Sequence, residues 1–278
     1  MNHETNLEQR LDDLVEAFKA DSGTYKDLET PSGTDGKRQL LRSLMNIRMP
    51  RTMDAATLRL QDAYLTERSR ERGVVTLDEI PTIGERLRSR HPHADRISLW
   101  QGDITRIAAD AIVNAANSQM LGCFQPCHSC IDNCIHTFAG VQLRLECAEK
   151  MEELRRRHGR GYEQPTAVPM LTHAYNLPAK KVIHIVGPIV DGELTERHER
   201  DLADCYRNTL DLCAENGLRS VAFCCISTGV FRFPKVRACE IAVQTVTDWL
   251  DANVEQIDRV IFNVFSDGGR AIYEQNLR

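Results

Sequence analysis

Apolar residues recur at helical spacing in the first ninety residues of this 278-residue chain. Three amphipathic helices are predicted, over about residues 7–18, 40–47 and 58–64, and Pro50 follows the second as a stop signal. The segment between the first two is rich in Gly, Ser, Thr, Asp and Pro, which is typical of a loop. We interpret residues 1–90 as a helical N-terminal extension that docks on the rest of the chain, because its apolar faces must be buried. A partner-binding appendage is the alternative.

The pattern changes from residue 96 onward, where short apolar runs alternate with amphipathic helical segments. Six runs are predicted as strands: RISLW, AIVNAA, AVPML, KVIHIV, VAFCCI and VIFNVF. Helices are predicted over about residues 138–158, 199–215 and 234–250, with a short one after Asp267. This alternation is typical of an α/β sheet covered on both faces. Residues 91–278 are therefore predicted to form one α/β domain that follows the extension.

The composition of the chain makes some classes of binding partner unexpected. The net charge of −5 and the isoelectric point near 6.0 provide no general attraction to nucleic-acid phosphates or anionic membranes, so nucleic acid is not the expected partner. No apolar run reaches the roughly 18 residues of a membrane-spanning helix, and the start MNHETNLEQR lacks the order of a secretory signal. We expect a cytoplasmic protein, in which the ten cysteines serve as thiols or metal ligands rather than as disulfides.

The stretch GCFQPCHSCIDNCIHTFAG contains four cysteines and two histidines. Cys123, His128 and Cys130 offer two sulfur donors and one nitrogen donor within a short loop, a set that suits tetrahedral Zn²⁺. Three protein ligands would leave a fourth position open, as in catalytic zinc sites. Cys127 or Cys134 would instead close the site as a structural zinc, and free thiols in a packed loop are the remaining alternative.

Polar residues follow three of the predicted strands. Asp103 follows the first, Asn114 and Asn117 close the second, and residues 227–229 follow the fifth. Amide side chains suit sugar hydroxyls, and backbone N–H groups that precede a helix suit anions. Each feature alone is a common turn, but together they would line one mouth of the sheet.

The segments GDITRIAADAIVNAANSQMLG, VIHIVGPI, SVAFCCISTGVFRFP and FNVFSDGGRAIYEQNL resemble the macrodomains, which are ADP-ribose-binding α/β/α modules. The resemblance covers about residues 96–278. It implies a three-layer α/β/α fold with a mixed six-stranded sheet and a ligand across the strand ends. It also implies these ligand contacts: Asp103 and Ile104 at the adenine, Phe265 stacked on the adenine, Asn117 at the distal ribose, and the backbone of Ser227, Thr228, Gly229, Val230 and Phe231 around the diphosphate.

The cysteine-rich stretch departs from ordinary hydrolytic macrodomains, which carry a glycine-rich loop at this place. It is similar to a zinc-containing microbial class with a helical N-terminal extension, whose Cys-x4-His-x-Cys pattern implies Cys123, His128 and Cys130 as ligands of one Zn²⁺. Asp132 takes the place of the acidic residue after the glycine-rich loop, where a carboxylate can orient or deprotonate water. A helix N-cap is the alternative role for Asp132.

The resemblance implies a zinc-dependent hydrolase that removes ADP-ribose from carboxylate side chains of modified proteins, with Asp132 and Asn117 as catalytic residues. The substrate that it suggests is a lipoyl-carrier protein modified by a sirtuin-type ADP-ribosyltransferase, and ADP-ribose would be the product. A non-catalytic ADP-ribose-binding module with a structural zinc and an O-acetyl-ADP-ribose deacetylase are the alternatives. His136 and His184 are expected to have structural roles.

Overall fold

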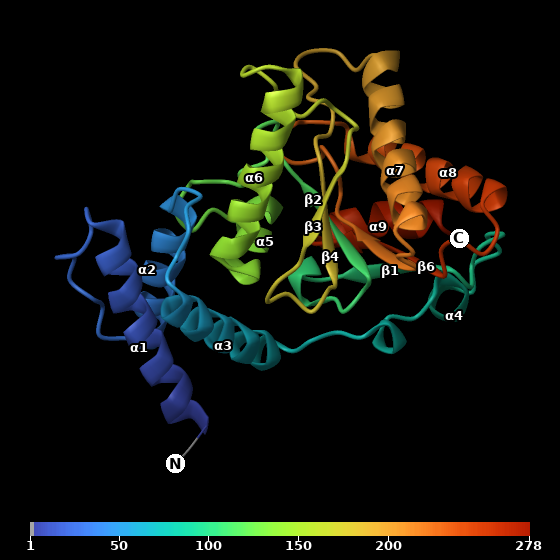
Figure 1. Ribbon diagram of the computed structural model, residues 1–278. Helices are drawn as coiled ribbons and strands as arrows, with labels where there is room; N and C mark the ends of the chain where they lie inside the picture. The colour runs from blue at the N-terminus through green and yellow to red at the C-terminus, as the bar shows by residue number, and fades with distance from the viewer. Residues whose placement is uncertain (1–2) are drawn as a thin grey trace.

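The helical extension forms its own small core at one side of the molecule (Figure 1). The structure is a computed structural model that describes the backbone of residues 3–278. Its first helices are α1 (His3–Ser22), α2 (Thr34–Ile47) and α3 (Ala55–Arg72). The buried residues of this core are Leu11, Leu14, Val15, Phe18, Leu41, Leu44, Met45, Tyr64 and Leu65. The extension is docked on the rest of the chain, because α2 and α3 both contact a helix that covers the sheet.

The second and larger part of the molecule contains a six-stranded mixed sheet. Its strands are β1 (Ile97–Gln101), β2 (Ala111–Ala115), β3 (Met170–His173), β4 (Lys181–Ile185), β5 (Ser220–Phe223) and β6 (Arg259–Val264). They lie in the order β1-β6-β5-β2-β4-β3, and every neighbouring pair is parallel except β3 with β4. Parallel strands buried on both faces read as nearly continuous apolar runs, which is why the sequence revealed them. The predicted mixed six-stranded α/β fold is confirmed.

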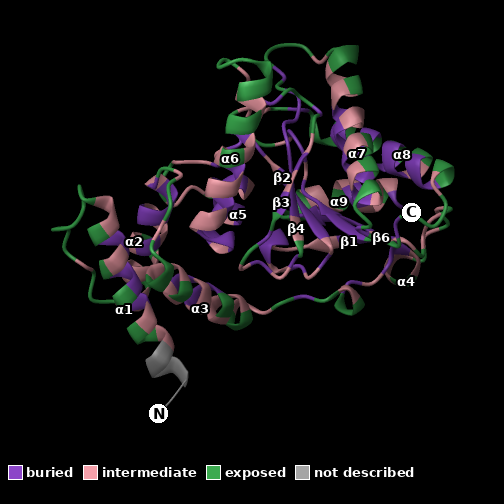
Figure 2. Cartoon of the chain, viewed as in Figure 1, coloured by how far each residue is buried: buried purple, intermediate pink, exposed green. Residues whose placement is uncertain are grey.

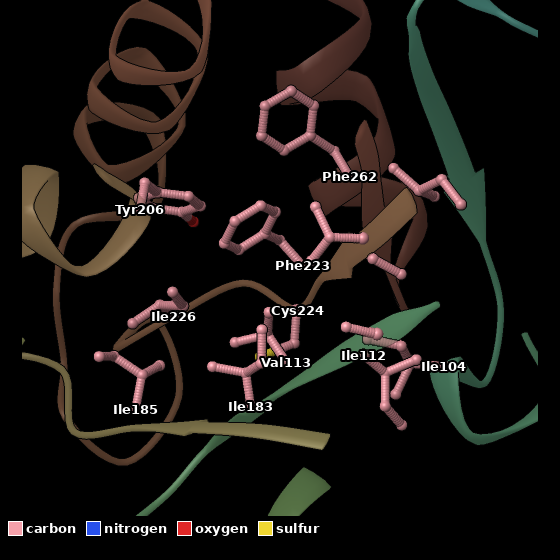
Figure 3. Packing of buried hydrophobic residues seen from close by; sticks show 14 of the residues in the cluster. Ile104, Ile112, Val113, Ile183, Ile185, Tyr206, Phe223, Cys224, Ile226 and Phe262 are labelled. Atoms are coloured by element: carbon pink, nitrogen blue, oxygen red, sulfur yellow. The ribbon is translucent and has the colours of Figure 1, made fainter. Parts of the chain in front are cut away.

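Helices cover both faces of this sheet, so the domain has three layers (Figure 1). The covering helices are α5 (Ile131–Ala139) and α6 (Val141–His158) on one face, and α7 (Glu196–Glu215), α8 (Lys235–Ala252) and α9 (Asp267–Asn276) on the other, while the short α4 (Ile83–Leu87) packs beside β1. On the second face the ring of Tyr206 lies 4.9 Å from that of Phe223, and Figure 3 shows both beside Phe262. Burial is concentrated in the strands and in the helix sides that face them (Figure 2).

Two predicted elements differ from the observed ones. The helix predicted over residues 138–158 is two helices, because Gly140 between them has a φ of 98°, a conformation that favours glycine. For the first of the two, α5, the sequence indicated only a helix start near Asp132, as the alternative role of that residue. The strand predicted at AVPML starts only at Met170, because Pro169 before it has no N–H to donate to a neighbouring strand.

Residues between the extension and the first strand pack with the sheet. Val75, Ile80 and Ile83 belong to the larger hydrophobic core rather than to that of the extension, and Val75 forms an isolated bridge to Ile107. The division of the chain at residue 90 stays a prediction. Among the helices of residues 3–278, none is long and apolar enough to span a membrane.

Candidate active site and metal cluster

The carboxyl ends of four parallel strands meet at one edge of the sheet. Asp103 follows β1, Asn117 follows β2, Ser227 follows β5 and Phe265 follows β6. The structure therefore brings these sequence-predicted residues to a common edge, the usual place for a ligand in α/β sheets.

The exit of β1 is shared with the extension. One carboxylate oxygen of Asp103 accepts hydrogen bonds from the Thr105 N–H (3.0 Å) and hydroxyl (2.6 Å). Arg72, at the end of α3, donates to the other oxygen and also to the Thr105 hydroxyl at 2.8 Å. Its guanidinium lies 3.5 Å from the ring centroid of Phe138. Ile104 is buried in the core, so at this exit Asp103 is the more accessible of the two predicted adenine contacts.

The carboxylate of Asp132, in the first turn of α5, lies beside the end of β2 and is only 6% exposed. Its Oδ1 accepts a hydrogen bond from the Asn114 side chain at 2.8 Å, and His136 Nε2 lies 3.6 Å away. Burial raises the pKa of Asp132 to about 6. The N-cap alternative for Asp132 is wrong, because Cys130 occupies the N-cap of α5 and its sulfur accepts from the Asn133 N–H at 3.4 Å.

Asn117 lies between this carboxylate region and the cysteine-rich loop. Its side-chain oxygen accepts from the Gln119 N–H at 3.0 Å, and its amide nitrogen donates to the Gly122 carbonyl at 3.4 Å. Gly122 has a φ of 78°, and a Cβ atom there would lie 2.7 Å from the ring of His136. The start of the loop thus needs glycine and is tied to the predicted ribose-binding amide.

The ligand atoms of Cys123, His128 and Cys130 lie within 4.8 Å of one another, and all three residues are half-buried. The Cys123 sulfur and His128 Nδ1 are 3.7 Å apart, close to the roughly 3.5 Å expected from tetrahedral Zn–S and Zn–N bonds. This donor set therefore fits a zinc ion. We call these three residues the metal cluster.

The two other cysteines of the loop point elsewhere. The Cys127 sulfur lies 3.2 Å from the Ser43 hydroxyl and donates to the Gln39 carbonyl at 3.4 Å, both on α2. The Cys134 sulfur accepts from Arg42 at 3.5 Å. Neither belongs to the group of converging ligand atoms, so the arrangement favours a site with three protein ligands.

A second group of converging atoms is formed by His136, Cys147 and His184, all buried. His184 Nδ1 lies 3.0 Å from the Asn114 amide and Nε2 lies 3.0 Å from the Thr172 hydroxyl. Burial lowers the pKa of His184 to about 4. Because both of its ring nitrogens have hydrogen-bond partners, His184 is a satisfied core histidine, as expected. Burial also lowers the pKa of His136, whose nitrogens have no hydrogen-bond partner in the described part of the chain.

The exit of β5 is a tight loop. Ser227 is a buried non-glycine residue with a φ of 62°, a conformation whose strain is often found at ligand-binding loops. Its carbonyl accepts from the Phe233 N–H at 3.0 Å. Beyond it Val230 is 77% exposed, and Phe265 at the neighbouring exit is 82% exposed. Two large apolar side chains are thus exposed to solvent at this edge of the sheet.

Comparison with known proteins agrees with this architecture. The model of the Macro domain family matches residues 113–242. A protein-ADP-ribose hydrolase of Treponema medium is 48% identical over 98% of each chain, and that of Staphylococcus aureus (strain MSSA476) is 41% identical over 96% of this chain and 94% of its own. The Trypanosoma brucei macrodomain in complex with ADP-ribose superimposes with a TM-score of 0.63 at 28% identity, over 85% of this chain and 95% of its own.

The fold and the family match define a macrodomain. The relatives, which align over nearly the whole length, narrow this class: the chain belongs to the macrodomain family of protein-ADP-ribose hydrolases and is an enzyme.

Sequence reasoning missed three arginines at the site. Arg42 and Arg72 come from the extension, and Arg144 comes from α6; each contacts the cysteine-rich loop or the β1 exit. In sequence they are charged positions on amphipathic helices, which usually face solvent. No local signal distinguishes them from the other arginines of these helices.

Proposed function

We propose that this enzyme is a zinc-dependent hydrolase that removes ADP-ribose attached to carboxylate side chains of proteins. The observation that carries the proposal is the convergence of the metal cluster at the start of α5. In this same helix, Asp132 stands at the β2 exit, where its carboxylate accepts from Asn114. The full-length similarity to protein-ADP-ribose hydrolases supports the reaction class.

The ligand would lie along the strand exits. Asp103, with Ile104 beside it, would accept a hydrogen bond from the adenine amino group, and the exposed ring of Phe265 would stack on the base. Asn117 would hold the distal ribose. The diphosphate would be wrapped by the backbone of Ser227, Thr228, Gly229, Val230 and Phe231. Binding far from the reacting bond would then position the distal ribose for attack.

Cys123, His128 and Cys130 would hold one Zn²⁺. When bound, the ion would supply Lewis acidity and a fixed position for a ribose hydroxyl or a water. Asp132 would orient the attacking water and accept its proton on Oδ2, since Oδ1 is engaged by Asn114. Asn114 is itself fully buried, so it fixes the orientation of the carboxylate.

The proposal extends to the substrate. A lipoyl-carrier protein modified by a sirtuin-type ADP-ribosyltransferase is the partner that the resemblance suggests, with ADP-ribose as product. We also propose a cytoplasmic location, where reductants would keep the cluster cysteines available for metal.

Elemental analysis and a time course test the proposal together. Protein purified without added metal should contain one zinc per chain, and ADP-ribose release from an aspartyl- or glutamyl-modified protein should stop on chelation and return with zinc. Tight ADP-ribose binding without release would indicate a binding module instead. Faster turnover of O-acetyl-ADP-ribose than of modified protein would indicate a deacetylase.

Replacing Asp132 by Asn tests whether the Asp132 carboxylate or the zinc ion activates the attacking water. We expect Asp132→Asn to keep its zinc and to lose at least about 100-fold in turnover, the scale of a general base. Asn133→Asp is not a suitable control, because the Asn133 amide donates to the Gln125 and Cys123 carbonyls of the loop. Asp267→Asn serves better, since Asp267 is an acidic residue in the first turn of α9. Undiminished turnover of zinc-loaded Asp132→Asn would exclude the carboxylate as the base.

A further inference from the structure

The loop that carries the metal cluster is bonded to α2 of the extension. The Cys127 N–H donates to the Asn46 side chain at 2.9 Å. The Cys127 sulfur contacts Ser43 at 3.2 Å and the Gln39 carbonyl at 3.4 Å. The middle of the loop, between the ligands Cys123 and His128, is thus fixed by one face of a helix about eighty residues away in sequence.

Arg42, on the same helix, contacts the loop directly at a ligand. Its Nη2 donates to the His128 carbonyl at 2.7 Å, to the Asn133 side-chain oxygen at 2.8 Å and to the Cys134 sulfur at 3.5 Å. Its Nε donates to the same Asn133 oxygen at 3.2 Å. These hydrogen bonds of Arg42 all go to the loop and to the start of α5.

Asn133 extends this contact to the other end of the loop. It is fully buried, and while its oxygen accepts from Arg42, its amide nitrogen donates to the Gln125 carbonyl at 2.9 Å and to the Cys123 carbonyl at 3.4 Å. Arg42 and Asn133 therefore connect the backbone of two cluster residues, Cys123 and His128, through one amide. Partners of this kind, outside the ligands themselves, orient the ligands and raise metal affinity.

We propose that Arg42 is a positioning residue of the metal cluster, and that α2 thereby makes the helical extension a part of the metal site. This inference rests on the zinc site proposed above. Arg42 touches neither a cluster side chain nor the strand exits where the substrate would lie, so it acts through loop geometry. A planar guanidinium can donate at once to the His128 carbonyl, the Asn133 amide oxygen and the Cys134 sulfur. A lysine ammonium on its flexible stem does this less well.

The test compares three full-length variants with the wild type. Arg42→Met removes every donor, and Arg42→Lys keeps the charge without the planar fork. Arg38→Met is the matched control, because Arg38 lies one turn earlier on α2 and pairs with Glu71 of α3 rather than with the loop. Zinc affinity is measured by competition with a chromogenic chelator, and turnover is measured with zinc in excess.

We expect Arg42→Met to bind zinc about 10- to 100-fold more weakly than the wild type, the range seen when outer-sphere partners are lost. Arg42→Lys should fall between the two, and Arg38→Met should match the wild type. Excess zinc should restore turnover of both Arg42 variants to within a few-fold, because no group that touches the substrate has changed. Melting temperatures of the metal-free variants identify any that fail to fold. If Arg42→Met does not fold, the zinc affinity of Arg42→Lys decides whether Arg42 positions the cluster.

Three outcomes would overturn the inference, and they are distinguishable. If the wild type binds zinc and folded Arg42→Lys and Arg42→Met bind it equally well, Arg42 does not position the cluster while the proposed function stands. A wild type that binds no zinc refutes the zinc site and the positioning role together. Equal weakening in Arg38→Met would mean that general stability of the extension, and not Arg42, sets the affinity.

Discussion

Replacing Arg144 by Met should destabilise the junction between the extension and the cysteine-rich loop. Arg144 lies on α6 and is only 5% exposed. Its Nε donates to the Leu121 carbonyl at 2.7 Å, where the loop begins. Its Nη1 donates to three carbonyls at the end of α2: Met45 (3.1 Å), Asn46 (2.8 Å) and Arg48 (2.6 Å). A cation at a helix C-terminus satisfies carbonyls that lack partners within the helix and complements its dipole.

The expected loss in the free energy of unfolding follows from these contacts. Hydrogen bonds from a charged donor contribute about 1.5 kcal/mol each at the lower end of their range. Arg144 also donates to the Cys123 carbonyl at 3.4 Å, and the four shorter bonds alone give a gross contribution of about 6 kcal/mol. Burial opposes them, because desolvation lowers the pKa of Arg144 from 12.5 to about 10. At about 1.4 kcal/mol for each pKa unit, this offsets about 3 kcal/mol. The free energy of unfolding of Arg144→Met should therefore fall by about 3 kcal/mol.

Urea denaturation followed by circular dichroism measures this difference, and the melting temperature should drop by roughly 6 °C for a chain of this size. Arg155→Met is the control, because Arg155 lies on the same helix but donates only to Gln119 at an exposed position. If the two variants unfold within about 0.5 kcal/mol of each other, the buried guanidinium does not hold the junction together and the reasoning is refuted.

Two further predictions concern the cluster and its surroundings. Cys127→Ser should keep one zinc per chain, because the Cys127 sulfur contacts α2 and not the cluster; elemental analysis that finds the zinc lost would instead indicate a closed site with a fourth protein ligand. His184 should make the protein sensitive to acid. Its pKa is about 4 when folded and 6.5 in its ordinary range, so the unfolded chain binds the proton more tightly between these values. The stability that neutral His184 provides is present above pH 6.5 and is lost as the pH falls toward 4, by about 3 kcal/mol in total. Denaturation of the wild type and of His184→Gln between pH 7 and 4 should show a smaller loss in the variant, and parallel curves would contradict the assignment.

Much of the fold could be predicted from local pattern. All six predicted strands overlap observed ones, with ends that differ by at most three residues, because strands buried on both faces are continuous apolar runs bounded by polar turns. The failures have local physical causes as well. A helix prediction based on apolar spacing ran through Gly140, since the backbone conformation of a glycine is not visible in periodicity. Only the start of the short α5 was considered, as the alternative role of Asp132, because the cysteines and histidines around it suggested chemistry.

The metal cluster shows what the spacing of residues in the sequence can predict. Cys123, His128 and Cys130 converge as predicted because they lie within one loop, where sequence separation limits spatial separation. Spacing alone could not decide between three and four protein ligands. The direction of the Cys127 sulfur depends on Ser43 and Gln39, which are more than eighty residues away.

The sequence by itself therefore determined the alternation of strands and helices, the polar residues at the strand exits and the set of cluster donors, all of which depend on neighbours along the chain. Only the tertiary structure decided that Asp132 is buried against Asn114, that Arg72 reaches Asp103, and that Arg42 and Arg144 connect α2 to the cysteine-rich loop. The physical reason is that long polar side chains find partners through the packing of whole helices, and the periodicity of a helix specifies its apolar face but not the groups that its charged side chains will meet.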